Sequence, residues 1–395
     1  MRSYLFPGSI SRLALFCLAL ATVACGFTNL TGCPPQKSEP LDDSTDYSDP
    51  SKLPDVVVPV NPPSPPTTRL NGKDLTTSAP ATLTAMAFQH ARAGAYQKAA
   101  QCQYWAVRAA NEGRYDLACW ESLAGNPETA IYWLQEAGRN EGVYAGWAEQ
   151  DPDLENVRDD RRWPNILRFL RACQNYWRAT GPKQTILIVP EGYVRETDLT
   201  LVVWLHGMGG NPADLKSDLQ SLANDHQIGF VGVSGTLPTG KTKFAWADSA
   251  EVDYDRIRLA LTEARERIRW REGTAVAFGF SQGAMVGLEV AVRYPEVFAG
   301  AISVSAGTGS PVQLDTVADK AALPRQGFVI VCGAKENPGS VERSNDLERW
   351  LKTGRANVLK PAYPNHAVHG FPAEYEERFP DWVAFIQRAR TGTGP

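Results

Sequence analysis

The residues with the clearest chemical potential form the stretch Gly279-Phe280-Ser281-Gln282-Gly283. A short apolar run, Thr274–Phe278, precedes this stretch, and Gln282–Arg293 has the composition of a helix. A serine between two glycines at a strand-to-helix turn is held in a strained conformation that leaves its Oγ exposed. A Cβ at either glycine would collide with the neighbouring strand or helix. Ser281 is therefore a candidate nucleophile, and the N–H of Gln282 would face a developing oxyanion.

A second glycine-rich stretch follows the apolar run Leu199–Leu205 and reads His206-Gly207-Met208-Gly209-Gly210-Asn211. Its glycines allow a turn in which an N–H, that of Met208, faces the same point as the N–H of Gln282. Two such donors form an oxyanion hole, and each would stabilise a tetrahedral intermediate by roughly 3 kcal/mol. We interpret His206 as a structural residue that supports this loop through hydrogen bonds, rather than as a base.

An acid is expected after the nucleophile along the chain, and a histidine base after the acid. The run Phe328–Cys332 is followed by Gly333 and Glu336, so Glu336 is the favoured acid. The alternatives are Asp346, farther along, and two weaker candidates that follow the preceding run, Asp315 and Asp319.

Two histidines compete for the role of base. His366 lies closer to the end of the last apolar run, whereas His369 begins the sequence His369-Gly370-Phe371. The base must reach the serine Oγ with one ring nitrogen and a carboxylate with the other. We favour His369, which lies just before the final helical segment.

The elements that must position these residues follow from the pattern after Pro182, where apolar runs alternate with amphipathic segments. The predicted strands are Thr185–Val189, Leu199–Leu205, Ile228–Val233, Thr274–Phe278, Ala299–Val304, Phe328–Cys332 and Val358–Tyr363. The predicted helices are Pro212–Asp225, Tyr254–Arg271, Gln282–Arg293, Val341–Thr353 and Ala373–Arg390. This alternation predicts an α/β domain with a mainly parallel sheet covered on both faces. Active sites of such sheets form at the carboxyl ends of the strands.

Residues 183–390 resemble the α/β-hydrolases, in the branch of carboxylesterases, acyl-protein thioesterases and dienelactone hydrolases. The stretch Gly279–Gly283 and the loop His206–Gly209 are similar to the first two groups, and His369-Gly370-Phe371 is similar to the third. The chain departs from the usual Gly-x-x-Asp by carrying Glu336. The resemblance implies a doubly wound domain over 182–390 that hydrolyses carboxylic esters or thioesters through a Ser-His-Glu triad. It also implies an acyl-enzyme intermediate and no cofactor.

The segment 236–250 follows the third predicted strand and contains Phe244 and Trp246. We expect these two aromatic residues to bind substrate by lining the acyl or leaving-group pocket; the alternative is that they close the core. The segment 307–326 is too short for a large lid, which favours an open cleft. The expected substrate is a small-molecule or polysaccharide ester.

A chain of 395 residues is long enough for two domains, and residues 81–180 differ in character from the rest. This segment is helical in pattern, and small residues recur at an offset of 31, as at Ala99 and Ala130. It resembles degenerate tetratricopeptide repeats, which implies a protein partner; the alternative is a helical bundle without a groove. The span 138–160 is predicted to be a long connection, and Trp163–Ala179 a closing helix. Cys102 and Cys119 fall on predicted adjacent helices, where either a disulfide or two thiols would fit.

The N-terminal segment indicates export. Leu13–Ala24 is almost wholly apolar but too short to span a bilayer, and it fits a signal-peptide core. Leu30-Thr31-Gly32-Cys33 resembles a bacterial lipobox, which implies a lipoprotein signal over 1–32 and diacylation of Cys33; Cys25 is the alternative. Residues 33–80 are rich in Pro, Ser, Thr and Asp and are predicted to form a disordered linker. We therefore expect a location in the cell envelope or periplasm, with the membrane reached only through the lipid anchor.

Composition excludes other classes. The net charge is −4, without a basic stretch for nucleic acid, and we find no Walker loop or zinc-ligand cluster, so no metal is expected. Two further functions stay open at this stage. One is a serine peptidase of the prolyl-oligopeptidase type, and the other is a catalytically silent binding protein that uses its helical repeats.

Overall fold

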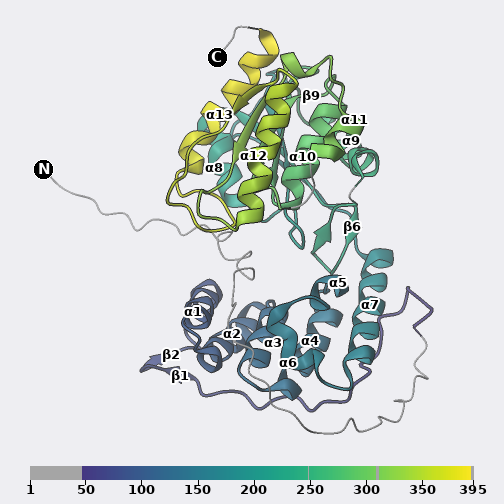
Figure 1. Cartoon of the computed structure of the whole chain (residues 1–395), viewed down its shortest axis with the longest axis vertical. Helices are drawn as coiled ribbons and strands as arrows, with labels where there is room; N and C mark the ends of the chain where they lie inside the picture. The colour runs from purple at the N-terminus through teal and green to yellow at the C-terminus, as the bar shows by residue number, and fades with distance from the viewer. Residues whose placement is uncertain (1–46, 248, 308–310, 393–395) are drawn as a thin grey trace, which may run out of the picture. The chain divides into compact units, whose positions relative to one another are not determined.

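The computed structural model describes residues 47–247, 249–307 and 311–392, which separate into two compact units (Figure 1). The sheet unit comprises Lys183–Leu237 and the residues from Phe244 onward. The helical unit runs through Pro182 and includes Pro238–Lys243. The predicted signal peptide over 1–32, with Cys25 and Cys33, lies outside the described residues. Across the described part of the chain, no helix has both the length and the apolar character needed to cross a membrane.

The sheet unit contains a mixed sheet in which each of the predicted apolar runs contributes a strand. The strands are β3 Thr185–Ile188, β4 Thr200–Leu205, β5 Ile228–Val233, β8 Ala275–Phe280, β9 Phe298–Val304, β10 Gly327–Val331 and β11 Asn357–Leu359. Their order in space is β11-β10-β9-β8-β4-β5-β3. All neighbouring pairs are parallel except β3 and β5, which are antiparallel.

Helices cover both faces of this sheet, because side chains alternate between the faces along each strand. In β4, Leu201, Val203 and Leu205 pack with one cluster of buried residues, while Val202 and Trp204 pack with the other. The first cluster includes residues of α9 Ala250–Arg265, α10 Gln282–Arg293 and α12 Pro338–Thr353. The second includes residues of α8 Lys216–His226 and α13 Tyr375–Thr391. Figure 1 shows the two helix layers on either side of the strands.

The parallel arrangement brings the ends of distant chain segments together. β4 pairs with β8, and β8 pairs with β9, which in turn pairs with β10. The loops after these four strands carry His206, Ser281, Ser305 and Glu336. Because the carboxyl ends of parallel strands meet at one edge, these residues share that edge of the sheet.

The helical unit consists of successive helices joined by short turns. They are α1 Pro80–Arg92, α2 Tyr96–Ala110, α3 Arg114–Leu123, α4 Pro127–Asn140 and, after an interval, α7 Trp163–Thr180. The predicted long connection over 138–160 is wrong in part, because it contains α5 Ala145–Ala148, a short 3-10 helix at Pro152–Leu154 and α6 Glu155–Arg158. Cys102, Cys119 and Cys173 are buried free thiols, as is Cys332 in the sheet unit.

The prediction of a disordered linker over 33–80 is wrong for residues 47–79, which lie against the helices. Val58 is 4% exposed, and its backbone N–H and C=O both bond to the side-chain amide of Gln135, at 3.0 and 2.9 Å. Beyond it, β1 Arg69–Leu70 pairs with β2 Lys73–Asp74, and Leu75 is fully buried. The prediction is based on average composition, which gives little weight to a few apolar residues. Their burial offsets the conformational entropy lost when an extended Pro-rich segment becomes ordered.

The loop Pro238–Lys243 belongs to the helical unit, so the predicted domain boundary at 182 needs one exception. Its backbone approaches Glu141 so closely that a Cβ on Gly240 would lie 1.6 Å from the Glu141 carbonyl oxygen. The buried carboxylate of Glu141 accepts a hydrogen bond from Arg114 at 2.8 Å and lies 3.5 Å from Lys243 Nζ. Glycine is therefore required at position 240, because any side chain there would overlap the Glu141 carbonyl group.

Candidate active site

Ser281 lies at the sharp turn between β8 and α10, in a backbone conformation that few residues other than glycine adopt. Its φ is 53° and its ψ is −117°. The flanking glycines are required by sterics, because a Cβ on Gly279 would lie 2.0 Å from the Gly283 carbonyl oxygen. A Cβ on Gly283 would lie 2.2 Å from the Leu205 carbonyl oxygen. Strain of this kind persists only where the surroundings impose it, and such positions concentrate at functional sites.

The structure brings Ser281, His369 and Glu336 together from three separate loops. His369 Nε2 lies 3.0 Å from Ser281 Oγ, and His369 Nδ1 lies 3.2 Å from Glu336 Oε2. With the Nδ1 proton directed to the carboxylate, Nε2 is left to accept the serine proton. The imidazole packs against the ring of Phe280, with centroids 5.2 Å apart. This arrangement matches the geometry of a serine nucleophile with a supported base.

Glu336 is buried, yet its surroundings favour the carboxylate over the acid. Burial acts to raise its pKa, but hydrogen bonds outweigh that effect and hold the pKa below its ordinary value. The donors are the His369 imidazole, the Gly333 N–H at 2.9 Å and the Ser305 hydroxyl at 2.8 Å. A carboxylate that accepts several hydrogen bonds stays ionised at neutral pH and supports an imidazolium.

The competing sequence candidates lie elsewhere. His366 Nε2 is 3.3 Å from the Gly370 carbonyl oxygen and does not contact Ser281. Asp346 pairs with Arg349 within α12, and Asp315 pairs with Lys320. Asp319 accepts the Ala321 N–H.

The predicted oxyanion donors, Met208 and Gln282, follow the adjacent strands β4 and β8 in the chain. Gln282 is the first residue of α10, directly after Ser281. In the other loop, the Gly209 N–H donates to Phe244 and the Gly210 N–H to Gly207. The Met208 N–H makes no hydrogen bond within the part of the chain that the structure describes. The Met208 amide is thus not used within the loop, and its role as an oxyanion donor stays a prediction.

His206 is a structural residue, as predicted. It is fully buried, and its Nε2 accepts the Gly235 N–H at 2.9 Å while Nδ1 lies 2.6 Å from the Gly207 carbonyl oxygen. Desolvation lowers its pKa to about 4, so the ring is neutral at physiological pH. A neutral ring with both nitrogens engaged supports the loop and has no capacity left to act as a base.

The prediction that Phe244 and Trp246 bind substrate is wrong in this structure, because their side chains are 0% and 1% exposed. Trp246 Nε1 donates to the His206 carbonyl oxygen at 2.8 Å. Its backbone is held by the side chain of Gln282, whose Oε1 accepts the Trp246 N–H at 3.1 Å. These aromatic residues therefore brace the turn at Ser281 and the loop at His206 from inside the core.

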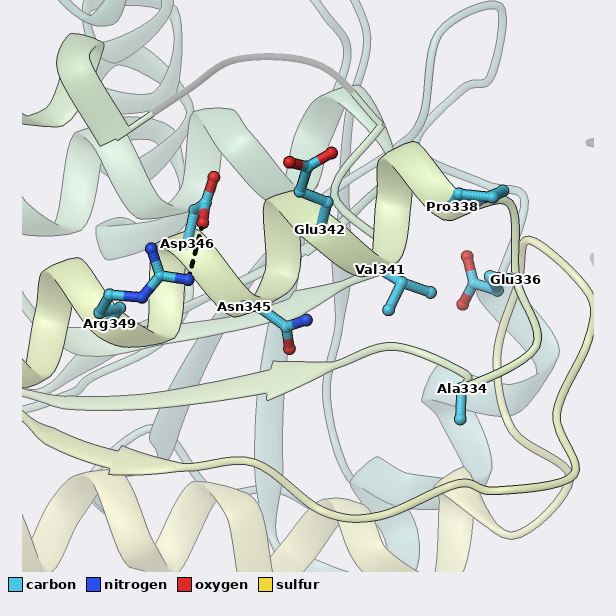
Figure 2. A pocket seen from close by; sticks show the side chains of 8 residues that line it. All are labelled: Ala334, Glu336, Pro338, Val341, Glu342, Asn345, Asp346 and Arg349. Atoms are coloured by element: carbon cyan, nitrogen blue, oxygen red, sulfur yellow. Dashed lines mark ion pairs between the residues drawn. The ribbon is translucent and has the colours of Figure 1, made fainter.

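A hollow of about 750 Å³ borders Glu336 along α12 (Figure 2). Its lining is mostly polar and includes the ion pair between Asp346 and Arg349, with Ala334, Pro338 and Val341 nearest to the acid. Ser281 is not among the lining residues.

One group of metal-type ligands occurs in the described ranges, in the helical unit: Cys119, Asp151 and Asp153. Asp151 already accepts hydrogen bonds from the Tyr115 hydroxyl at 2.7 Å and from the Asp153 N–H at 3.0 Å. Its carboxylate thereby caps the 3-10 helix at Pro152–Leu154. This structural role accounts for the position of Asp151 without a bound metal ion.

Sequence reasoning missed three contributors near Ser281. Ser305 donates to Glu336, and the side chain of Gln282 clamps Trp246. Gly307 leaves room for the Ser281 hydroxyl, because a Cβ there would lie 2.6 Å from Ser281 Oγ. The signal for Ser305 was its place directly after a buried strand, at the edge where the other site residues were expected.

No protein-family profile matches the chain. A Bacillus subtilis (strain 168) protein named "Putative hydrolase MhqD" is 26% identical over 200 residues, which cover 48% of this chain and 95% of that protein. A carboxylesterase structure from Bacillus cereus is 16% identical with a TM-score of 0.40, and covers 53% of this chain and 98% of its own. The Zea mays acyl-protein thioesterase 2 is 19% identical with a TM-score of 0.40, and covers 52% and 100% of the two chains.

Proposed function

We propose that the chain is a serine hydrolase that cleaves carboxylic ester or thioester bonds through Ser281, His369 and Glu336. The observation that carries the proposal is the pair of contacts from His369, 3.0 Å to Ser281 Oγ and 3.2 Å to Glu336 Oε2. The similarity to a protein named as a hydrolase agrees with it.

In the first half-reaction, His369 Nε2 takes the hydroxyl proton as Ser281 Oγ bonds to the acyl carbon. The carbonyl oxygen becomes an oxyanion that accepts hydrogen bonds from the Met208 and Gln282 N–H groups, each contributing roughly 3 kcal/mol. Collapse of the tetrahedral intermediate breaks the bond to the leaving alcohol or thiol, which takes the proton from His369. The product is an ester of the acyl group on Ser281.

In the second half-reaction, a water gives a proton to His369 and its oxygen bonds to the acyl carbon. Collapse releases the carboxylic acid, and the proton on His369 returns to Ser281 Oγ. Throughout, Glu336 stays ionised and stabilises the imidazolium.

The proposed substrate is a small-molecule or polysaccharide ester, and the proposed location is the cell envelope, with a lipid anchor at Cys33. The helical unit would serve a protein partner in the manner of tetratricopeptide repeats. Radiolabelled palmitate and sensitivity to globomycin test the anchor; unlabelled protein in the soluble periplasm would contradict it.

The test of the catalytic assignment is turnover of p-nitrophenyl acetate and labelling by a fluorophosphonate probe. We expect Ser281→Ala and His369→Ala each to lower kcat by about 10⁴-fold or more, because Ser281 bonds to the acyl carbon and His369 takes the serine proton. His366→Ala is the matched control, since His366 lies three residues away and does not contact Ser281. We expect it to keep kcat within about threefold of wild type, because it touches no reacting atom.

Turnover that survives Ser281→Ala would contradict the proposal. Wild-type protein that neither turns over the ester nor reacts with the probe would favour a binding protein. Loss of activity in His366→Ala with retention in His369→Ala would reassign the base.

A further inference from the structure

Ser305 occupies a position from which it reaches the acid of the site without contacting the solvent. It directly follows β9, is fully buried, and its Oγ lies 2.8 Å from Glu336 Oε1. The same oxygen lies 3.2 Å from the carbonyl oxygen of Gly370, the residue after His369. One hydroxyl therefore lies between the acid and the backbone that carries the base.

The backbone of Ser305 is itself held in place. Its φ is 49°, a left-handed conformation that is uncommon for a residue with a Cβ. Its N–H donates to the Val331 carbonyl oxygen at 2.8 Å, which anchors it to the neighbouring strand β10. The conformation is thus imposed by the sheet edge, and the hydroxyl is aimed from a rigid support.

Glu336 needs such support because its side chain has three rotatable bonds and the terminal one has a broad energy minimum. Oε2 faces His369 Nδ1, while Oε1 receives both the Ser305 hydroxyl and the Gly333 N–H. Two donors on one oxygen fix the rotation of the carboxylate, and this sets the direction of the other oxygen. The Glu336 side chain is 0% exposed, so in this structure its donors are protein groups.

The Ser305 hydroxyl has one proton and two acceptors within reach. The carboxylate is charged and lies closer than the Gly370 carbonyl, and charge-assisted hydrogen bonds are shorter and stronger than neutral ones. The proton therefore goes to Glu336.

We propose that Ser305 is a positioning residue that holds the Glu336 carboxylate in the orientation in which it supports His369. The proposal rests on the function proposed above. It implies that Ser305, which lies outside the triad, contributes to the catalytic rate. Ser305 acts through Glu336 and touches no substrate.

The experiment compares Ser305→Ala and Ser305→Gly with the wild type. Both variants remove the hydroxyl. Glycine also adopts the left-handed backbone conformation without strain, so the Ser305→Gly variant should fold even if Ser305→Ala does not. The matched control is Ser303→Ala, two residues earlier on β9. Ser303 is 1% exposed, and its Oγ has no hydrogen-bond partner among the residues that the structure describes.

We measure kcat and KM for p-nitrophenyl acetate, and the titration of the Glu336 carboxyl by NMR with 13C-labelled glutamate. We expect both Ser305 variants to lower kcat on the order of tenfold, the usual effect of losing a hydrogen bond to a charged group. KM should stay within about twofold, and Ser303→Ala should match wild type. The pKa of Glu336 should rise in the two Ser305 variants and not in the control.

Wild-type kcat in both Ser305 variants, or an equal loss in Ser303→Ala, would overturn the proposal, as would an unshifted Glu336 titration. Failure of the underlying function is distinguishable. Wild-type protein without Ser281-dependent turnover would overturn the hydrolase assignment, and the carboxyl titration would then decide by itself whether Ser305 governs Glu336.

Discussion

At the scale of single residues, two buried titratable groups near the site end in opposite charge states, although burial favours the neutral form of both. Desolvation lowers the pKa of His206 and leaves the ring neutral, although the Gly207 carbonyl oxygen beside Nδ1 favours the protonated form. Glu336 is also buried, but its donors stabilise the charged form. Several hydrogen bonds to the ionised group together outweigh desolvation at Glu336, whereas the single one at His206 does not.

The depressed pKa of His206 predicts a loss of stability in mild acid. The folded-state pKa is about 4, below the ordinary histidine value of about 6.5, so the unfolded chain binds the proton more readily between these values. Stability is then fully present above about pH 6.5 and falls as the pH drops toward 4. At pH 5 the expected loss from this residue is about 2 kcal/mol.

Urea unfolding at pH 7 and pH 5 measures this loss, with His206→Gln as the comparison because glutamine does not titrate. If the free energy of unfolding falls between pH 7 and pH 5 by the same amount in His206→Gln as in the wild type, the assignment to His206 is contradicted. His226, which is exposed at the end of α8, supplies the control substitution His226→Gln.

At the scale of elements, the turn between β8 and α10 depends on how closely the helix approaches the sheet. The two glycines of the turn face backbone carbonyl oxygens of the sheet and helix at distances that no Cβ tolerates. Backbone atoms of β4 and α10 cannot move aside without breaking the parallel pairing of β4 and β8. The element pair thus maintains both the strain at Ser281 and the placement of the Gln282 amide.

This predicts opposite outcomes for two glycine-to-alanine substitutions on one helix. Gly283→Ala places a Cβ 2.2 Å from the Leu205 carbonyl oxygen and should destabilise the protein by more than about 3 kcal/mol. Gly287→Ala meets its nearest atoms at 3.5 Å, an ordinary contact, and should be neutral or stabilising by up to about 1 kcal/mol. Thermal unfolding of both variants checks the prediction, and equal midpoints would contradict it.

At the scale of the whole molecule, the two units have separate cores. The buried clusters of the sheet unit contain residues from Ile188 onward, and those of the helical unit end at Cys173. The extended segment 47–79 belongs to the helical cores through Val58, Leu70 and Leu75. Separate cores allow one unit to lose stability while the other keeps its structure.

Leu75→Ala should therefore lower the stability of the helical unit by about 2–5 kcal/mol and leave the proposed ester turnover near the wild-type value at 25 °C. Leu75 is fully buried, whereas Val56 in the same segment is 38% exposed. Val56→Ala is thus the control, with an expected change within about 0.5 kcal/mol. Calorimetry resolves the transitions; an unchanged profile for Leu75→Ala would show that the segment does not contribute to the core.

The sequence by itself determined the features that depend on neighbours in the chain. Alternating apolar runs predicted each strand of the sheet, and α10 begins and ends at the predicted residues. The glycines around Ser281 and the order of Ser281, Glu336 and His369 indicated the site, because local sterics and strand direction decide where such turns lie. Position along the chain could not separate His369 from His366.

Only the tertiary structure decided which side chains meet. It placed His369 and not His366 against Ser281, buried Phe244 and Trp246, and brought Ser305 to Glu336. It also packed residues 47–79 on the helices, against the expectation from composition. Contacts between residues far apart in the chain depend on loop paths and packing that no local pattern encodes, since the same side chain can face solvent or core according to what lies opposite.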